Sequence, residues 1–488
     1  MDTLNQDMLI EILSYLPQYD KIQSSNVCKL WNNINKYIYK SNIDINYNKF
    51  VHPSFKTWIK DKNIKLKLDF TNIHTLSLKF DTEKDIETLI LQLCGYYTIP
   101  ESVFQLSSLT YLNASVNDIT SISNSISLLS NLKELHLYKN ELITLPFEMS
   151  QLKNLEILLL NFNNFETIPD CIYHLENLKE LHIAHNDIQS ISPNIKLLSN
   201  LQVLNIQSNN ISSLPSSIFE LQKLEMLYCS YNYIQVIPEE IFRLKNLVRF
   251  FIDYNRVEYI PNSIGKLTKL EILSLEGNML TKIPDSIGNL TDLKILTLNC
   301  NKIVQIPDSI CKLNLLKELG LNDNLLTELP ESIVSLQNCK YLYLCYNYLQ
   351  FLPNSIGRMT RLKKLNVSNN QLTFIPLSIG MLQNLKSLGL QNNMIKYLPH
   401  TIGLLKKLIY LNLEFNNLEK IPKGIGFLEN MVHLNLRNNN LTHLPTTMNN
   451  MSSCLKELYI GGNEITFYPK HVESAIIIDE DDVHIHFE

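Results

Sequence analysis

Cysteine and histidine are the residue types in this chain whose chemistry would matter most if their spacing matched a known site. The chain has 488 residues, with 9 cysteines and 12 histidines. The cysteines are odd in number, scattered and never spaced as C-x-x-C, which is typical of reduced thiols rather than of disulfides or a zinc site. The sequence also lacks a phosphate-binding glycine loop and a credible pair of nucleophile and base. We therefore expect a protein that is not an enzyme and that holds no metal and no cofactor.

Asparagine is the polar residue with a regular spacing. It recurs every 23 residues from Asn117 to Asn439, and once more at Asn463 after a step of 24. Leucines accompany it in the pattern L-x-x-L-x-L-x-x-N-x-L, and Cys94 takes its place one period before Asn117, which makes seventeen units. An amide side chain both donates and accepts hydrogen bonds, so it can satisfy backbone groups where the chain turns. We expect these asparagines to be structural rather than catalytic.

This pattern is a leucine-rich repeat, and it predicts how each unit folds. The L-x-L segment is a short strand whose leucines point inward, and stacked units form a parallel sheet on the concave side. Proline follows six residues after the asparagine position in fifteen units, the exceptions being Ser123 and Ser192. Proline removes a backbone donor, so the convex side should be irregular or 3-10 rather than α-helical. The predicted fold class is an α/β leucine-rich-repeat solenoid with a small N-terminal three-helix module.

The short 23-residue unit, with its I/L-P-x-x-I-G-x-L ending, resembles the intracellular class of leucine-rich-repeat proteins that includes the Ras-suppressor and Ras-scaffold families. The resemblance covers residues 86 to about 477. It implies a fold rather than a partner, because the shared positions are those that build the scaffold.

The outward positions of the predicted strands form the candidate binding surface. They lie six, four and two residues before each asparagine, and the residue directly before the asparagine stands at the rim. The outward strand positions carry seven acidic and three basic residues, a net charge of −4, so a basic or neutral protein partner fits this face better than RNA. Aromatic residues and arginine dominate interface hot spots. The predicted partner-binding residues are Met226, Tyr228, Tyr231, Arg249, Phe251, Asp253 and Tyr254 in one cluster, and Tyr341, Tyr343 and Tyr346 in another. The alternative is that neighbouring tyrosines only stack along the sheet.

Three histidines near the start of the repeats could suggest a metal site. His136 and His182 occupy equivalent positions two units apart, and His185 stands at the rim. Two strand spacings amount to about 9–10 Å, whereas zinc ligands each lie about 2 Å from the metal. We therefore interpret these histidines as polar surface residues.

Residues 1–40 follow a different pattern from the repeats. The apolar residues within 4–16 form one face of a helix that Pro17 ends, and Asp20 can cap a second, short helix. Apolar residues within 27–34 repeat at i, i+3, i+4 and i+7, which predicts a third helix.

This segment resembles an F-box, most specifically at its ending Val27-Cys28-Lys29-Leu30-Trp31, whereas the Leu-Pro opening of that family is Leu4-Asn5 here. The resemblance implies that the three helices dock a Skp1-type adaptor and bring the partner held by the repeats to a cullin-based ubiquitin ligase. The residues it assigns to adaptor binding are Leu4, Leu9, Ile12, Leu13, Leu16, Val27 and Trp31. Two alternatives remain open: a helical cap that only covers the end of the solenoid, and an intracellular signalling scaffold whose repeats bind a small GTPase or a phosphatase.

Composition limits the remaining possibilities. The net charge of −5 gives no basic field for nucleic acid or an anionic membrane, so we expect neither as a partner. The N-terminus lacks the pattern of a signal peptide, and we expect a monomer, apart from its partners, in the cytoplasm or alternatively the nucleus. Strand-like alternations at 64–70 and 73–78 should begin the sheet. The predicted organisation is an F-box-like module at 1–40, a linker and N-terminal cap at 41–85, seventeen repeats at 86–477, and a C-terminal cap or acidic tail at 478–488.

Overall fold

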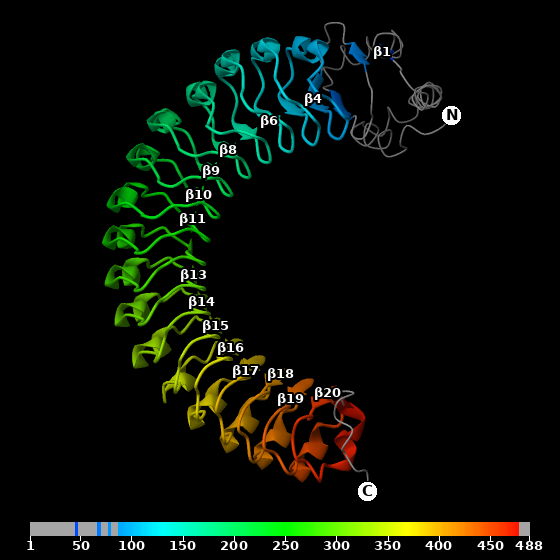
Figure 1. Cartoon of the computed structure of the whole chain (residues 1–488), viewed down its shortest axis with the longest axis vertical. Coiled ribbons are helices and arrows are strands. Elements are labelled where there is room, and N and C mark those ends of the chain that lie inside the picture. The colour runs from blue at the N-terminus through cyan, green and yellow to red at the C-terminus, as the bar shows by residue number, and fades with distance from the viewer. Residues whose placement is uncertain (1–43, 47–65, 70–76, 80–85, 478–488) are drawn as a thin grey trace, which may run out of the picture. The chain divides into compact units, whose positions relative to one another are not determined.

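The computed structural model describes residues 44–46, 66–69, 77–79 and 86–477, which belong to two compact units that meet in the chain between Tyr228 and Cys229. Both units are built in the same way. Short parallel strands lie side by side along one edge, and 3-10 helices lie along the opposite edge (Figure 1). Each repeat supplies one strand and one helix. The predicted leucine-rich-repeat solenoid is therefore confirmed, including its 3-10 side.

The first unit contains a parallel sheet whose strands follow one another in chain order. They are β2 (Leu66–Asp69), β4 (Ile86–Ile90), β5 (Tyr111–Asn113), β6 (Glu134–His136), β7 (Ile157–Leu159), β8 (Glu180–His182), β9 (Val203–Asn205) and β10 (Met226–Tyr228). Strand β2 begins this sheet, as the sequence predicted. The second expected strand, β3 (Ser77–Lys79), pairs instead with β1 (Asp44–Asn46) in a separate two-stranded sheet.

The second unit repeats this arrangement, again with parallel pairing between consecutive strands. Its strands are β11 (Arg249–Phe251), β12 (Ile272–Ser274), β13 (Ile295–Thr297), β14 (Glu318–Gly320), β15 (Tyr341–Tyr343), β16 (Lys364–Asn366), β17 (Ser387–Gly389), β18 (Tyr410–Asn412), β19 (His433–Asn435), β20 (Glu457–Tyr459) and β21 (Ile476–Ile477).

Proline starts most of the 3-10 helices, because its fixed φ suits a helix start and its missing N–H is not needed there. Ser123 and Ser192, which stand at the proline position in two repeats, cap their helices with the side chain: each hydroxyl oxygen accepts a hydrogen bond at 3.2 Å from the backbone N–H two residues later. In these two repeats a serine side chain thus starts the 3-10 helix where most repeats use proline. The helices of the first unit are η1 (Glu101–Gln105), η2 (Asn124–Leu128), η3 (Phe147–Gln151), η4 (Asp170–His174), η5 (Pro193–Leu197) and η6 (Ser216–Glu220). Those of the second are η7 (Glu239–Arg243), η8 (Asn262–Lys266), η9 (Asp285–Asn289), η10 (Asp308–Lys312), η11 (Glu331–Ser335), η12 (Ile356–Arg358), η13 (Leu377–Met381), η14 (His400–Leu404), η15 (Lys423–Phe427), η16 (Thr446–Met451) and η17 (Lys470–Ala475).

The core of each unit lies between the strands and the helices. The central leucine of a strand, such as Leu296 of β13, is fully buried, while its two neighbours on the strand are partly exposed. The repeated asparagine closes the turn after the strand. Asn278 is typical: its Nδ2 donates to Ile252 O at 3.0 Å and Leu275 O at 3.2 Å, and its Oδ1 accepts from the Val257 N–H at 2.9 Å. The expectation that these asparagines satisfy backbone groups is therefore confirmed.

Candidate protein-binding face

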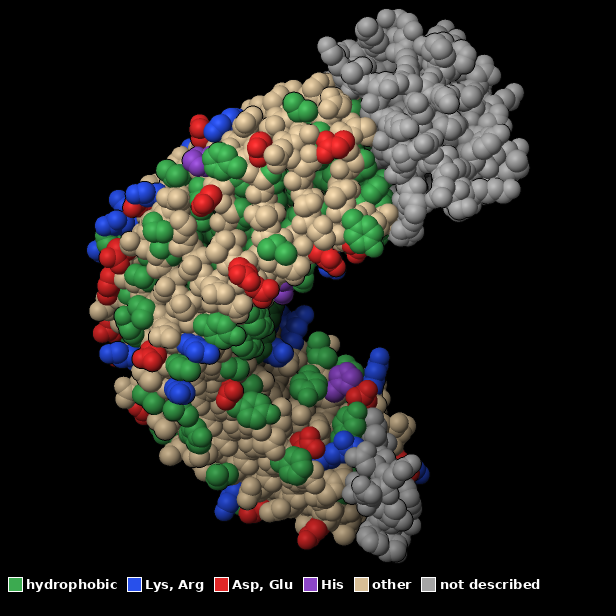
Figure 2. Space-filling model, turned by 45° about the horizontal axis from the view of Figure 1, so that its top comes forward, with side chains coloured by type: hydrophobic (Ala, Val, Ile, Leu, Met, Phe, Trp, Pro, Cys, Tyr) green, Lys and Arg blue, Asp and Glu red, His purple; other side chains and the backbone are tan. Residues whose placement is uncertain are grey.

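The strand surface that faces away from the core presents the residues that the sequence predicted to bind a partner. In most strands the first and third residues are partly exposed and the middle one is buried, because successive side chains point to opposite faces of a sheet. On the face that Figure 2 shows, hydrophobic side chains are dispersed among polar ones and both signs of charge occur. Such a mixed surface suits a protein partner.

The rim carries a feature that the sequence pattern did not reveal. The residue directly before the repeated asparagine has a positive φ of about +50° to +57° where it is not glycine. This left-handed conformation is unusual for bulky side chains, yet aromatic residues occupy it and are exposed. They are Phe162, Tyr231, Tyr254, Tyr346 and Phe415. Because aromatic residues are enriched at protein interfaces, the exposed rim aromatics of each unit are candidate contact residues.

The first predicted cluster is divided between the two units. Met226 and Tyr228 lie on β10 of the first unit, where the Tyr228 hydroxyl contacts Met226 Sδ at 3.4 Å. Arg249 and Phe251 lie on β11 of the second unit, and the Arg249 Nε is buried without a hydrogen-bond partner among the described residues.

Two rim tyrosines of the second unit stack on each other. The rings of Tyr231 and Tyr254 have centroids 4.7 Å apart and are almost parallel. The Tyr254 hydroxyl donates to Glu276 Oε1 at 2.8 Å, and this hydrogen bond is the main cause of the raised pKa of Tyr254. The predicted stacking of neighbouring tyrosines is thus present, yet Tyr231 and Tyr254 remain about half exposed at their outer faces.

Asp253 has a structural role that its sequence position did not indicate. Its Oδ2 accepts from the Ser230 hydroxyl at 3.1 Å, and its Oδ1 accepts from the Glu276 N–H at 2.8 Å and from the Ser274 hydroxyl. These bonds tie three consecutive repeats of the second unit together. A partner would therefore have to compete with the chain itself for this carboxylate.

The second predicted cluster lies together on one repeat of the second unit. Tyr341 and Tyr343 are the partly exposed residues of β15, and Tyr346 stands at the rim, 60% exposed. The Lys364 ammonium lies 5.2 Å from the centre of the Tyr343 ring, a cation–π distance. Burial is the main cause of the raised pKa of Tyr343.

His136 and His182 of the first unit each lie beside a glutamate of the same strand. His136 Nε2 lies 3.7 Å from Glu134 Oε2, and His182 Nε2 lies 3.4 Å from Glu180 Oε2. Burial, and then the charge of His182, lower the pKa of His136. Within the part of the chain that the structure describes, no three histidine, cysteine or acidic side chains gather as metal ligands would.

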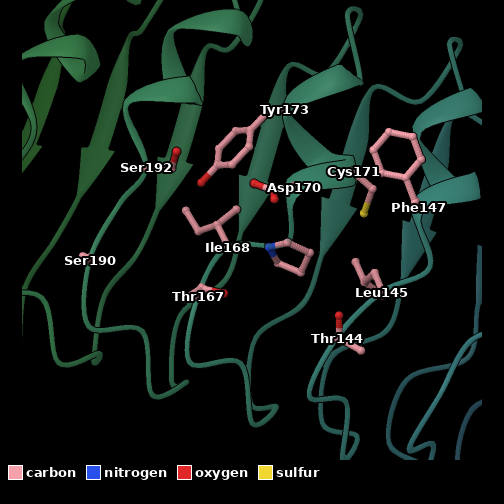
Figure 3. A pocket seen from close by; sticks show the side chains of 11 residues that line it. Thr144, Leu145, Phe147, Thr167, Ile168, Asp170, Cys171, Tyr173, Ser190 and Ser192 are labelled. Atoms are coloured by element: carbon pink, nitrogen blue, oxygen red, sulfur yellow. The ribbon is translucent and has the colours of Figure 1, made fainter.

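A shallow hollow in the first unit lies on the path from the strands to the helices (Figure 3). It has a volume of about 470 Å³ and is lined by Thr144, Leu145, Phe147, Thr167, Ile168, Pro169, Asp170, Cys171, Tyr173, Ser190 and Ser192. Burial raises the pKa of the Cys171 thiol and of the Tyr173 hydroxyl to about 12. Both groups are therefore protonated at neutral pH, so the hollow offers no activated nucleophile.

The seven residues predicted to bind the adaptor all lie outside the described residues, and so does the acidic tail at 478–488. Among the elements that the structure does describe, none is a helix with the length and apolar character needed to cross a membrane.

Comparison with known families and structures agrees with this architecture. Residues 1–36 match the model of the F-box domain. Residues 130–188 and 360–418 match a leucine rich repeat model, and residues 187–301 and 281–375 match a leucine-rich repeat region model. The curated proteins contain no match.

Solved structures with the same fold include a leucine-rich-repeat protein of Leptospira interrogans, which is 32% identical, with 81% of this chain and 96% of that chain covered and a TM-score of 0.70. A TDR receptor is 29% identical, with 85% and 71% covered and a TM-score of 0.68. The ectodomain of the Arabidopsis receptor kinase HAESA, in complex with an N-terminally extended IDA peptide hormone, is 28% identical, with 80% and 69% covered and a TM-score of 0.66.

The repeats, their asparagine hydrogen bonds and the parallel sheets define a leucine-rich-repeat protein. With its N-terminal match, the chain belongs to the F-box leucine-rich-repeat family. An F-box implies binding to a Skp1-type adaptor, and the repeats imply binding to a target protein, as in substrate-recognition proteins generally. The matched families are adaptor and repeat domains, and no catalytic family is among them.

Proposed function

We propose that this protein is the substrate-recognition adaptor of a Skp1-cullin-F-box-type ubiquitin ligase, with its target bound on the outward strand face of the repeats. The observation that carries the proposal is the F-box match at residues 1–36 in the same chain as the repeats. The F-box would hold the adaptor while the repeats hold the target, so that the two partners are linked through one polypeptide. The contacts proposed for the adaptor are Leu4, Leu9, Ile12, Leu13, Leu16, Val27 and Trp31.

The face of the repeats supports the second half of the proposal. Exposed aromatic side chains at the rim and partly exposed tyrosines on β15 supply the residue types that dominate protein interfaces. The HAESA ectodomain, which has the same fold, is solved with a peptide hormone. A solenoid of this kind can therefore present a surface to a polypeptide partner. We expect the target to contact the two aromatic clusters.

The test is co-purification of residues 1–488 with a Skp1-type adaptor. A Leu13→Asp, Trp31→Ala variant should lose the adaptor, because a charge and a cavity replace two apolar contacts of the proposed docking surface. A matched variant, Leu128→Asp with Phe147→Ala, changes the same kinds of residue on exposed positions of the 3-10 helices and should retain it. Circular dichroism checks that the repeats remain folded in both. Absence of adaptor binding by the intact chain would refute the proposal.

The runner-up function is a signalling scaffold that binds a small GTPase or a phosphatase without a ligase role. The observation that favours it is the short repeat with a 3-10 helix in place of an α-helix, the type that resembles the Ras-suppressor class. In that case the intact chain would bind no Skp1-type adaptor, and the N-terminal helices would act only as a cap.

A further inference from the structure

Strand β7 forms an apolar strip on the outward strand face of the first unit. Both of its outward residues, Ile157 and Leu159, are aliphatic and partly exposed. Every other strand from β5 to β10 has at least one polar or aromatic residue at these two positions. We call Ile157 and Leu159 the β7 strip.

Matching polar pairs flank the β7 strip on both sides. Strands β6 and β8, its neighbours in the sheet, both read Glu-Leu-His, so each presents one glutamate and one histidine at its outward positions. The register places Ile157 between the glutamates, Glu134 and Glu180, and the other aliphatic residue between the histidines. An apolar centre with a polar rim is the usual anatomy of a protein interface.

The two flanking glutamates lack a strong cationic partner among the described residues. Their ion-pair contacts are with the histidines of their own strands, at 3.7 Å for Glu134 and 3.4 Å for Glu180. Burial, and then the charges of Glu180 and Glu156, raise the pKa of Glu134. Burial lowers the pKa of His136, so this histidine is neutral near pH 7 and does not offset the charge. A cation brought by a partner would relieve the repulsion between these carboxylates.

The lysines next to these glutamates in the sequence do not supply that cation. Lys133 and Lys179 directly precede Glu134 and Glu180, yet neither forms an ion pair with them in the part of the chain that the structure describes. Lys179 pairs instead with Glu156 at 2.6 Å. The face thus combines an aliphatic centre with negative charge on either side.

We propose that the β7 strip and its flanking glutamates bind a basic amphipathic helix of the target protein. This inference deepens the proposed function and rests on it, because it assigns the chemistry of the target. The two glutamates lie two strand intervals apart, about 9–10 Å. Residues seven positions apart on an α-helix are about 10.5 Å apart and lie on the same face. An arginine or lysine at each of these positions would reach one glutamate, while apolar residues three and four positions along the helix would lie on the β7 strip.

The spacing and the charge disfavour other occupants. In an extended segment laid across the strands, side chains on one face recur about every 6.7 Å, which matches neither one nor two strand intervals. A single metal ion cannot bridge residues two strands apart, and no three potential metal ligands gather within the described ranges. A nucleic acid would be repelled by the carboxylates.

The test is fluorescence anisotropy with the purified full chain and a labelled, alanine-rich peptide of about 16 residues, long enough for partial helicity. The peptide carries two arginines seven positions apart, with two leucines at the third and fourth positions between them. Glu134→Gln, Glu180→Gln should weaken binding about tenfold, because two charge pairs are lost. The matched variant Glu141→Gln, Glu166→Gln removes the same charge from exposed positions of the same unit. It should bind within about twofold of the native chain, since distant surface charges are screened.

Leu159→Asn tests the apolar half of the site. Asparagine already occupies the third position of β5 and of β9, so the strand should tolerate it. Binding should weaken about threefold to tenfold, because a partly exposed aliphatic contact is lost. A peptide of the same composition with its two arginines adjacent should also bind more weakly, and raising the salt from about 50 to about 300 mM should weaken binding by the native chain.

Three results would overturn the proposal. They are equal binding by the Glu134→Gln, Glu180→Gln variant and the native chain, equal binding of the rearranged peptide, and no binding of the first peptide by the native chain. All of these variants should still co-purify with the Skp1-type adaptor, since their substitutions lie in the repeats. A native chain that binds the adaptor but not the peptide would refute this inference alone, whereas one that binds the peptide but no adaptor would refute the ligase role alone.

Discussion

Replacing Asn324 by alanine tests how much one asparagine of the repeat contributes. Asn324 is 3% exposed, and its Oδ1 accepts from the Ile303 N–H at 2.9 Å. Its Nδ2 donates to Leu298 O at 2.9 Å, Leu321 O at 3.3 Å and Asn322 O at 3.1 Å. The substitution removes all four hydrogen bonds at once.

The structure shows which of these losses is compensated. Leu298 O still receives a hydrogen bond from Asn301, and Leu321 O still receives one from Asn347. The buried Ile303 N–H, by contrast, loses the acceptor that Asn324 supplied. Leaving one buried donor unpaired costs about 1–3 kcal/mol, so we expect local destabilisation of about 2 kcal/mol, which corresponds to about thirtyfold faster amide exchange.

The measurement is hydrogen–deuterium exchange followed by mass spectrometry, with the peptide that contains Ile303 as the readout. A local measurement is needed because the stability of a repeat array is a sum over neighbouring units rather than one global transition. Asn338→Ala is the matched control: Asn338 is partly exposed, and its side chain donates to Asn314 O at 2.6 Å and accepts from Arg361 in solvent-exposed hydrogen bonds that water can replace. Its effect should stay below about 0.5 kcal/mol. Equal exchange in the two variants would refute the structural interpretation of the asparagines.

Three further predictions concern titration, binding and thiol reactivity. Burial lowers the pKa of His136, so the unfolded chain binds a proton at this histidine more tightly than the folded chain does. The free energy of unfolding should therefore fall as the pH drops below about 6.5. Denaturant titrations above and below this pH should show a weaker pH dependence for a His136→Phe variant. A Tyr228→Ala, Phe251→Ala variant should bind the target about tenfold or more weakly in a pull-down titration, and unchanged affinity would contradict the assignment of that cluster. Burial raises the pKa of Cys229 well above its usual range and that of Cys339 to about 12, so both thiols should resist alkylation at pH 8 until denaturant is added; rapid labelling of the folded chain would count against their burial.

The repeat architecture could be predicted from the sequence because its period records which residues are neighbours in space. A residue 23 positions away occupies the same place in the next unit, so the leucines, the asparagines and the proline that starts each helix are all visible as a pattern. Ser123 and Ser192 could be recognised as departures, but their capping hydrogen bonds required the structure. The F-box pattern was likewise recognisable, because its ending at 27–31 is specific in type and spacing, and the family match at residues 1–36 agrees.

The properties of the binding face depended on the tertiary structure. The left-handed backbone that projects Tyr254 and Tyr346 at the rim is not encoded in a distinctive residue type, since bulky and small residues share that position. The hydrogen bonds that commit Asp253 to its neighbours also emerged only there. Periodicity determines which residues lie on the same row, because it follows from the repeating backbone. The length of each side chain and its neighbours across the sheet decide which side chains in a row pair with each other and which remain available to a partner. Only the folded chain brings those neighbours together.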